Sequence, residues 1–457
     1  MTRTITTRNP ATGAAIETFE RMDPDTARAT VGRCHNAFRD WRLKPLSERA
    51  EVIRAIGATL RADREAFAQL MTREVGKLIG DSRGEIDLCA AICDFTADNG
   101  PDVLADETRT IPGGRGVISY QPLGVIYGIQ PWNFPAYQAV RYAVACLMAG
   151  NGVLLKHAEN CTGSALFLRE VMARAGLPED LFAVLVIDHD TSDAIIADPH
   201  VRGVTLTGSD AAGRLVAQKA AAEVKKTVLE LGSNDAYIVL SDADMDTALD
   251  ACLTGRLFNN GQTCVNAKRF IVHKDHYDTF VDRYTRRMRD TAMGDPADED
   301  TELGPMARED LRDTLHHQVR DSVQAGARVL CGGTVPDRAG AFYPATVLVD
   351  VAPGQPAYDD ELFGPVASII RAEDDDHAMR LANDSRYGLG GGIFSADTDR
   401  ARDLARLHFD TGMVSINSFN VAIPNMPFGG GKASGHGREH GGFGMREFVN
   451  AKSIYMA

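Results

Sequence analysis

A cysteine in a polar turn is the first residue whose type and setting suit nucleophilic chemistry. Cys264 ends the segment Asn259–Cys264, which contains a glycine and lies between an expected helix and an expected strand. A thiol in such a turn can be exposed and surrounded by polar groups, as a nucleophilic thiolate requires. Free cysteines are more often small core residues, so the turn by itself also fits a structural role.

A carboxylate stands inside an apolar segment further upstream. Glu230 lies between two leucines in Val228–Gly232, immediately before Leu231 and a glycine. Burial there would raise the pKa of the carboxyl towards neutrality, which suits a general base acting on water. A helix-capping or salt-bridged glutamate is the alternative interpretation.

A neutral amide is enclosed by two prolines and two aromatic residues in the segment 130–135. Prolines fix the backbone, and the side chain of Asn133, held rigidly, can donate a hydrogen bond to a developing oxyanion. A proline-rich loop with aromatic packing explains the segment equally well.

A fourth segment is suited to binding an anion. The expected strand that ends at Thr207 runs into Gly208 and Ser209, and a helix follows. Backbone amides and a hydroxyl at a helix N-terminus suit a pyrophosphate. The chain holds no G-x-G-x-x-G, so the usual dinucleotide fingerprint is absent.

The elements that must position these residues alternate between strands and helices. From 137 to 245 this alternation predicts a doubly wound parallel sheet, which usually binds a nucleotide at the carboxyl ends of its strands. A second series begins after Asp246, with strands over 268–273, 327–331 and 366–371. The fold class is therefore α/β, with two such domains.

The N-terminal part is expected to be helical, and a β-rich segment follows it. Apolar residues recur at helical spacing in 25–38, 47–74 and 80–98, with Asp25 and Ser47 as plausible N-caps. Short β-rich runs between 116 and 129 predict a hairpin or a crossing arm.

Composition sets limits on the class of function. The 457 residues include 49 Lys or Arg and 63 Asp or Glu, which gives a net charge of −14. This field repels polyanions and excludes a general nucleic-acid binder. We expect no secretory signal, no membrane span and a cytoplasmic location. Eight scattered cysteines indicate reduced thiols, and the pairs His273/His276 and His436/His440 are expected to be surface residues, so no metal site is predicted.

Taken together, these segments resemble the aldehyde dehydrogenase superfamily from about Asn9 to the C-terminus. The motifs that carry the resemblance follow one another in the family's order: P-W-N-F-P at 131–135, K-H-A-E at 156–159, T-G-S at 207–209, E-L-G at 230–232, G-Q-T-C at 261–264, E-L-F-G-P at 361–365 and P-F-G-G at 427–430. The resemblance implies a nucleotide-binding domain over 1–110 and 130–230, a catalytic domain over 231–436, and an oligomerisation arm formed by 111–129 and 437–457.

The resemblance also implies a role for each matched position. Cys264 is the nucleophile that forms a thiohemiacetal, Asn133 holds its oxyanion, and Glu230 activates the water that hydrolyses the thioester. The remaining matched positions bind the nicotinamide cofactor: Trp132, Lys156, Glu159, Gly208, Ser209, Glu361 and Phe363. We expect NAD to be preferred over NADP, because the carboxylate of Glu159 would repel a 2′-phosphate.

A narrower likeness is to succinate-semialdehyde dehydrogenases of the short bacterial type. Arg141 matches an arginine that contacts the substrate carboxylate in those enzymes, whereas Phe258 replaces a second arginine that some of them carry. The alternatives are a dehydrogenase for an aromatic or aliphatic aldehyde and a catalytically silent binding or structural member. The expected partners are a small aldehyde substrate and further copies of the chain in a homodimer or homotetramer, with no nucleic acid and no membrane.

Overall fold

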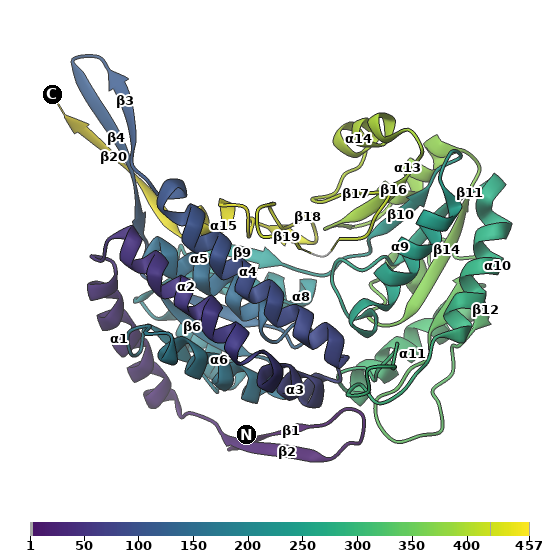
Figure 1. The fold of residues 1–457 in the computed structure, drawn as a ribbon, viewed down its shortest axis with the longest axis horizontal. Coiled ribbons are helices and arrows are strands. Elements are labelled where there is room, and N and C mark those ends of the chain that lie inside the picture. Colours follow the sequence, from purple (N-terminus) through teal and green to yellow (C-terminus); the bar gives the residue numbers. More distant parts are fainter. Residues whose placement is uncertain (1–2, 421, 457) are drawn as a thin grey trace.

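Two sheets organise the chain, each parallel except for one edge strand (β19 in the first and β12 in the second), and a narrow arm projects from the first (Figure 1). The computed structural model describes residues 3–420 and 422–456. The predicted α/β class and the second doubly wound series are confirmed. Among the residues described, no helix is long and apolar enough to cross a membrane.

The first sheet has six strands in the order β19-β9-β8-β5-β6-β7, of which only β19 runs antiparallel to its neighbour. Its strands are β5 (Val125–Gln130), β6 (Gly152–His157), β7 (Phe182–Val184), β8 (Val201–Thr207), β9 (Lys226–Glu230) and β19 (Gly435–His436). The connecting helices are α5 (Tyr137–Ala149), α6 (Thr162–Arg174), α7 (His189–Ala197) and α8 (Asp210–Ala222). Every residue of β6 is buried, as expected for a strand that helices cover on both faces.

An N-terminal layer precedes this sheet. It consists of the hairpin β1 (Thr4–Arg8) and β2 (Ala15–Glu20) and of α1 (Pro24–Trp41), α2 (Leu46–Ala62), α3 (Arg64–Val75) and α4 (Ile79–Val103). The predicted caps are wrong. Asp23 caps α1 by accepting a hydrogen bond from the Thr26 backbone, and α2 begins before Ser47 without a side-chain cap. The expected helix over 47–74 is divided at Asp63.

The second sheet has seven strands in the order β12-β13-β14-β11-β10-β16-β17. Its strands are β10 (Ala236–Val239), β11 (Arg269–His273), β12 (Arg328–Cys331), β13 (Thr346–Val349), β14 (Val366–Ala372), β16 (Gly391–Phe394) and β17 (Ser415–Ile416). Its main helices are α9 (Met245–Leu257), α10 (Lys274–Asp290), α11 (Glu309–Gln324), α13 (Asp375–Asn383) and α14 (Thr398–Leu407). The prediction missed β13 and β16, because strands of four buried residues show no alternation of polar and apolar side chains.

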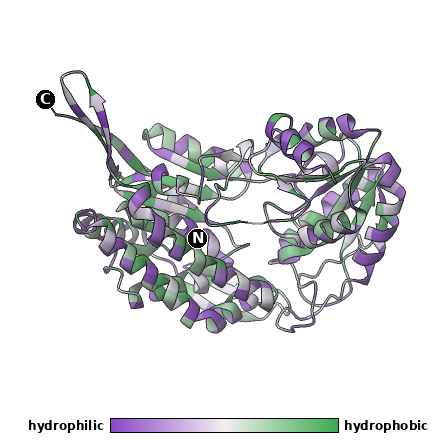
Figure 2. Cartoon of the chain, turned by 45° about the horizontal axis from the view of Figure 1, so that its top comes forward, coloured by the Kyte–Doolittle hydropathy of each residue, from purple (hydrophilic) through white to green (hydrophobic). Residues whose placement is uncertain are grey.

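Hydrophobic and hydrophilic residues mix along most helices (Figure 2), whereas every residue of α5 is buried. On α10 the buried side chains Phe280, Tyr284 and Met288 recur every four residues, while arginines occupy exposed positions between them. This spacing places one apolar stripe against the second sheet.

The arm is a three-stranded antiparallel sheet in the order β20-β4-β3, and it carries the C-terminal strand (Figure 1). Its strands are β3 (Glu107–Ile111), β4 (Gly114–Pro122) and β20 (Val449–Met456), and α15 (Phe443–Glu447) leads into β20. The predicted arm segment 111–129 differs from the observed arm at both ends. The arm begins at Glu107, and β5 pairs with β6 and β8 inside the six-stranded sheet.

Candidate active site

The expected catalytic residues come from loops of both sheets. Asn133 follows the carboxyl end of β5, Glu230 is the last residue of β9, and Cys264 lies in the turn just before β11. Asn133 and Glu230 therefore lie at strands of the first sheet, and Cys264 lies at a strand of the second sheet. Glu361 pairs with Lys268, whose ammonium donates to the backbone carbonyl of Cys264, and the charge of Glu230 acts on the Cys264 thiol.

The Cys264 turn has an unusual backbone. Asn259 and Asn260 both adopt left-handed conformations, with φ of 53° and 55°, and Gly261 follows with φ of 76°. A Cβ on Gly261 would lie 2.3 Å from the carbonyl carbon of Gly364, so only glycine lets these two backbones meet. The motifs G-Q-T-C and E-L-F-G-P therefore pack against each other.

Cys264 is one of two cysteines that are not fully buried, and Cys331 is the other. Loss of water raises the pKa of the Cys264 thiol to about 12, and Glu230 and Glu361 raise it too, while Arg141 and Lys268 lower it. The free side chain is therefore a thiol at neutral pH. Its ionisation depends on which neighbouring charges are compensated.

Asn133 is buried against this turn. Its Nδ2 donates to the carbonyl of Gln262 at 3.0 Å, and its backbone carbonyl accepts from Nδ2 of Asn259 at 2.8 Å. Gln138 donates to its Oδ1 at 3.4 Å. Hydrogen bonds on both sides therefore hold the amide of Asn133, in addition to the restriction that the two prolines place on the backbone.

A buried carboxylate on α4 holds the loop that carries Asn133. Glu85 forms a buried ion pair with Lys77, and its Oε1 accepts from the backbone nitrogens of Ala136 and Tyr137 at 2.8 and 2.9 Å. It thereby satisfies free N–H groups at the start of α5. The Lys77 ammonium lies 3.6 Å from the ring centroid of Phe134.

The same helix also contacts the nucleophile turn. Oδ2 of Asp81, one turn before Glu85, accepts from the backbone nitrogen of Asn259 at 3.1 Å. The side chains of α4 therefore fix both catalytic loops. Sequence analysis missed this role, because charged residues at four-residue spacing are typical of a solvated helix face.

Glu230 is buried, as its apolar segment predicted. It is 1% exposed, and neither carboxylate oxygen has a hydrogen-bond partner among the residues described. Burial raises its pKa well above the usual range, and Arg141 opposes this shift. A Cβ on Gly429 would lie 2.7 Å from Oε1, so the glycine of P-F-G-G makes room for the carboxyl.

Arg141 lies buried on α5 and is already paired. Its Nε forms an ion pair with Glu439, and its Nη2 donates to Oγ1 of Thr207 at 2.8 Å. Its Nη1 lies 3.4 Å from the hydroxyl of Tyr137, and the Phe428 ring centroid is 5.0 Å from the guanidinium carbon. Glu439 was not identified from the sequence, although an acidic residue within the glycine-rich tail was a signal for it.

The prediction of surface histidines is wrong for His273, which is 6% exposed, and for His440, which is 7% exposed. Nε2 of His440 lies 2.9 Å from the hydroxyl of Tyr137. Burial and the nearby Arg141 lower its pKa to about 3, so the ring is neutral. Within 3–420 and 422–456, His, Cys, Asp and Glu do not gather in threes as a metal site would need.

Several residues expected at the cofactor lie at strand ends of the first sheet. Lys156 is buried near the end of β6, and burial lowers its pKa. Glu159 has a half-exposed side chain that pairs with Arg21 at 2.9 Å. Ser209 caps α8 by accepting from the backbone of Ala212 at 3.2 Å, and the Gly208 nitrogen donates to the Glu230 carbonyl at 3.0 Å.

The other expected cofactor residues lie beside the nucleophile turn. Trp132 and Phe363 meet edge to face, with centroids 5.7 Å apart. Oε1 of Glu361 accepts from the backbone nitrogen of Ser233 at 3.1 Å and pairs with Lys268 at 3.0 Å. Neither Ser233 nor Lys268 was singled out in the sequence, although Lys268 stands only four residues after Cys264.

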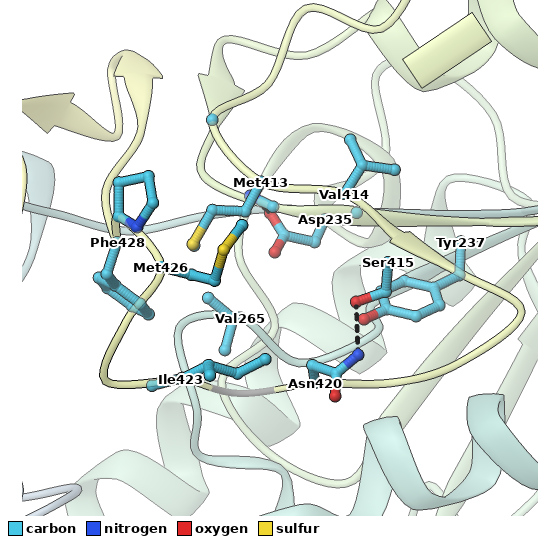
Figure 3. A pocket seen from close by; sticks show the side chains of 15 residues that line it. Asp235, Tyr237, Val265, Met413, Val414, Ser415, Asn420, Ile423, Met426 and Phe428 are labelled. Atoms are coloured by element: carbon cyan, nitrogen blue, oxygen red, sulfur yellow. Dashed lines mark hydrogen bonds between the residues drawn. The ribbon is translucent and has the colours of Figure 1, made fainter. Parts of the chain in front are cut away.

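A cavity of about 260 Å³ adjoins the nucleophile turn (Figure 3). Its wall includes Val265, the residue after Cys264, and Phe428, which pack in one cluster with Cys264. Met413, Ile423 and Met426 add apolar surface, whereas Asp235, Ser415 and Asn420 add polar groups. A largely apolar cavity therefore lies beside the turn that carries Cys264.

Comparison with known proteins shows the family of this chain. The model of the Aldehyde dehydrogenase family matches residues 1–454. The chain belongs to the aldehyde dehydrogenase family. A succinate-semialdehyde dehydrogenase [NADP(+)] of Deinococcus radiodurans is 44% identical over 99% of this chain and 94% of its own length. A succinate semialdehyde dehydrogenase [NAD(P)+] of Escherichia coli is 43% identical over 98% and 96%.

Solved structures of aldehyde dehydrogenases share the whole fold. The crystal structure of succinic semialdehyde dehydrogenase from Streptococcus pyogenes in complex with NADP+ is similar with a TM-score of 0.97, 37% identity and 99% coverage of both chains. The enzyme from Burkholderia pseudomallei gives 0.96 and 33%, over 99% of this chain and 94% of its own. The protein is thus an aldehyde dehydrogenase, as its motifs predicted.

Proposed function

We propose that this aldehyde dehydrogenase oxidises succinate semialdehyde to succinate through a thiohemiacetal and a thioester on Cys264. The observations that support this chemistry are the hydrogen bond from Asn133 to Gln262 in the Cys264 turn and the effect of the Glu230 charge on the Cys264 thiol. A thiol, a fixed amide donor and a buried carboxyl are the three groups that such a reaction needs.

Each of these side chains has a distinct task. The Cys264 sulfur attacks the aldehyde carbon, and the amide of Asn133 donates to the oxygen that becomes negative. The buried carboxyl of Glu230, once ionised, takes a proton from the water that cleaves the thioester. The thiol is released, and the carboxylic acid leaves as its anion.

A nicotinamide cofactor fits the residues beside this centre. Both contacts of Glu361 use Oε1, which leaves Oε2 to accept from a ribose hydroxyl. Lys156 and Glu159 would hold the adenosine ribose, with Trp132 and Phe363 nearer the thiol. When bound, the cofactor supplies the hydride acceptor that converts a thiohemiacetal to a thioester.

The substrate assignment rests on Arg141 and on the names of the relatives. The guanidinium is the cation whose charge acts on both Glu230 and Cys264, and relatives over 40% identical are named succinate-semialdehyde dehydrogenases. A buried arginine recognises a carboxylate through charge-assisted hydrogen bonds. Its pair with Glu439 occupies Nε and leaves the two terminal nitrogens directed at Tyr137 and Thr207.

A matched pair of variants tests this assignment. Arg141→Ala should lower kcat/KM for succinate semialdehyde by about 30- to 1000-fold relative to butanal, because only the charged aldehyde loses an ionic partner. Glu439→Gln, which frees the guanidinium, should keep or increase the preference for the charged aldehyde. Equal losses for both aldehydes in both variants would contradict carboxylate recognition.

The cavity favours a second candidate function, oxidation of an aromatic or aliphatic aldehyde. Its wall beside Cys264 is formed by Val265, Met413 and Phe428, and Arg141 already has an anionic partner. A kcat/KM panel over succinate semialdehyde, benzaldehyde and hexanal separates the two. Higher values for hexanal or benzaldehyde would favour this second function.

The comparisons do not support the predicted preference for NAD, because the relatives are named for NADP(+) or NAD(P)+ and one solved neighbour is a complex with NADP+. We propose that this enzyme accepts both cofactors and uses NADP at least as efficiently as NAD. The supporting observation is that Arg21 pairs with the carboxylate of Glu159 at 2.9 Å and so compensates part of the charge that would repel a 2′-phosphate. Lys156 adds a second positive charge near Glu159. Values of kcat/KM for both cofactors decide the preference.

For the assembly, we propose that the arm joins copies into a homodimer or homotetramer. Ile454 and Tyr455 on β20 are 41% and 76% exposed, which is a large apolar exposure for a terminal strand. We propose 1–106 with 125–230 as the nucleotide-binding domain, because β3 pairs with β4 in the arm and β5 pairs with β6 and β8. We propose 231–436 as the catalytic domain and β3, β4 and β20 as the arm. Sedimentation of a chain truncated before Val449 should show monomers.

A cytoplasmic location stays a prediction.

A further inference from the structure

One buried lysine connects the nucleophile to the carboxylate expected at the cofactor. Lys268, the residue before β11, is 2% exposed. Its ammonium donates to Oγ of Ser233 at 2.7 Å and to the backbone carbonyl of Cys264, and it pairs with Oε1 of Glu361 at 3.0 Å. All three partners lie on different segments of the chain.

Ser233 closes the same network. Its hydroxyl donates to the carbonyl of Cys264, and its backbone nitrogen donates to Oε1 of Glu361 at 3.1 Å. The carbonyl of Cys264 therefore has two donors, and Glu361 has two donors from the same pair of residues. A change in the charge or hydrogen bonding of Glu361 therefore alters the electrostatic field at Lys268 directly, and no movement of the backbone is needed.

The charged groups around the thiol come from several elements. Arg141 on α5 and Lys268 favour the thiolate, whereas Glu230 at the end of β9 and Glu361 oppose it. Asp235, next to β10, also faces Lys268. Arg141 is compensated by Glu439, and Lys268 is compensated by Glu361. Only the second compensation involves a residue expected to contact the cofactor.

We propose that Lys268 is a positioning residue that makes the reactivity of the Cys264 thiol depend on the state of Glu361. When a ligand donates hydrogen bonds to Glu361, the carboxylate offsets the ammonium less, and the field of Lys268 at the sulfur grows. Binding at the ribose position thereby prepares the nucleophile. The ligand-dependent half rests on the cofactor role proposed above for Glu361.

The test follows alkylation of Cys264 by iodoacetamide against pH, without cofactor or substrate. A Cys331→Ser background leaves Cys264 as the one cysteine that is not buried among the residues described. Lys268→Met should lower the rate about tenfold below the thiol pKa, which corresponds to a shift of one pH unit in its pH profile. Lys268→Arg should restore the rate, because the charge returns.

The variant Glu361→Gln should change the alkylation rate in the opposite direction to Lys268→Met. Removing this negative charge should accelerate alkylation, whereas a merely structural network would be weakened by either change. Lys432→Met is the matched control, because Lys432 pairs with Asp410 at the surface, and it should leave the rate unchanged. If Lys268→Met does not fold, as judged by circular dichroism, the Arg and Gln variants carry the test. An unchanged pH profile in Lys268→Met or Glu361→Gln would overturn the proposal.

A second arm adds NAD. Alkylation of the parent should then accelerate, and this response should disappear in both Lys268→Met and Glu361→Gln. Acceleration that persists in Lys268→Met overturns the coupling. If NAD binds by fluorescence titration but changes nothing in the parent, the coupling is overturned while the proposed oxidation remains possible. If NAD does not bind, the proposed cofactor fails, and the rates without cofactor still decide the effect of Lys268 on the thiol.

Discussion

The reacting end of the site and its adenosine end are built in different ways. Around Cys264 the charged side chains are largely buried: Arg141 pairs with Glu439, Lys268 pairs with Glu361, and Glu230 has no hydrogen-bond partner among the residues described. At the adenosine end Lys156 is buried, but the half-exposed carboxylate of Glu159 forms its ion pair with Arg21 where solvent reaches it. Buried charges interact strongly and are costly to leave unpaired, whereas exposed charges are screened. Substitutions should therefore have graded effects from the first end to the second.

The largest effect is expected at the nucleophile. Cys264→Ala should reduce aldehyde oxidation by about 10⁴-fold or more, because the covalent intermediate cannot form. Binding of NAD should stay within about threefold of the parent, because a missing thiol removes no charge from the cofactor contacts. Cofactor reduction is followed by absorbance and binding by fluorescence. Substantial residual turnover would place the nucleophile elsewhere.

The buried carboxyl should produce the next largest effect, and it depends on pH. The pKa of Glu230 is raised, so the group is protonated and inactive as a base at low pH and gains activity as pH rises through that pKa. Steady turnover of the parent should rise with pH where hydrolysis of the thioester is limiting. Glu230→Gln should remove this rise and slow turnover by about 10²- to 10⁴-fold. A variant that keeps the pH dependence would assign it to another group.

The support from α4 should appear in stability. Glu85→Gln leaves the ammonium of Lys77 buried without its ionic partner, which should lower the free energy of unfolding by about 3–5 kcal/mol. Asp87→Asn on the same helix breaks an exposed pair with Arg64 and should cost about 0–1 kcal/mol. Urea unfolding measures both. Similar small losses would show that α4 does not hold the catalytic loops.

The smallest effect is expected at the adenosine end. Glu159→Gln should raise kcat/KM for NADP about three- to tenfold and leave the value for NAD nearly unchanged, because only the phosphorylated cofactor gains from loss of a half-exposed negative charge. Glu170→Gln, another exposed acidic position in the same domain, is the control. A change in kcat/KM as large as the losses expected at the reacting end would contradict the difference between the two regions.

The sequence was informative where chemistry and local pattern coincide. The apolar setting of Glu230 predicted its burial, and the polar turn predicted that Cys264 is one of the less buried cysteines. Alternation of strands and helices predicted the two parallel sheets. Such features are local, so a single segment contains the signal.

Contacts between distant segments were not predictable in the same way. Glu439 and Lys77 look like surface charges in their own segments, and only the fold brings them to Arg141 and Glu85. The caps failed for a related reason, since Asp23 and Asp25 are equally suitable by type and the backbone decides between them. The arm boundary failed because the extended runs of β4 and β5 differ in pairing partner and not in composition.

The most direct test of covalent oxidation is to trap the acyl enzyme in the Glu230→Gln variant. The variant is mixed with succinate semialdehyde and NAD, and the account predicts a burst of reduced cofactor equal to the active sites, followed by slow turnover. Mass spectrometry of the quenched protein should then find one succinyl group on the peptide that contains Cys264. A burst with no acyl group on Cys264, or rapid turnover with no burst, would contradict the division of labour between Cys264 and Glu230.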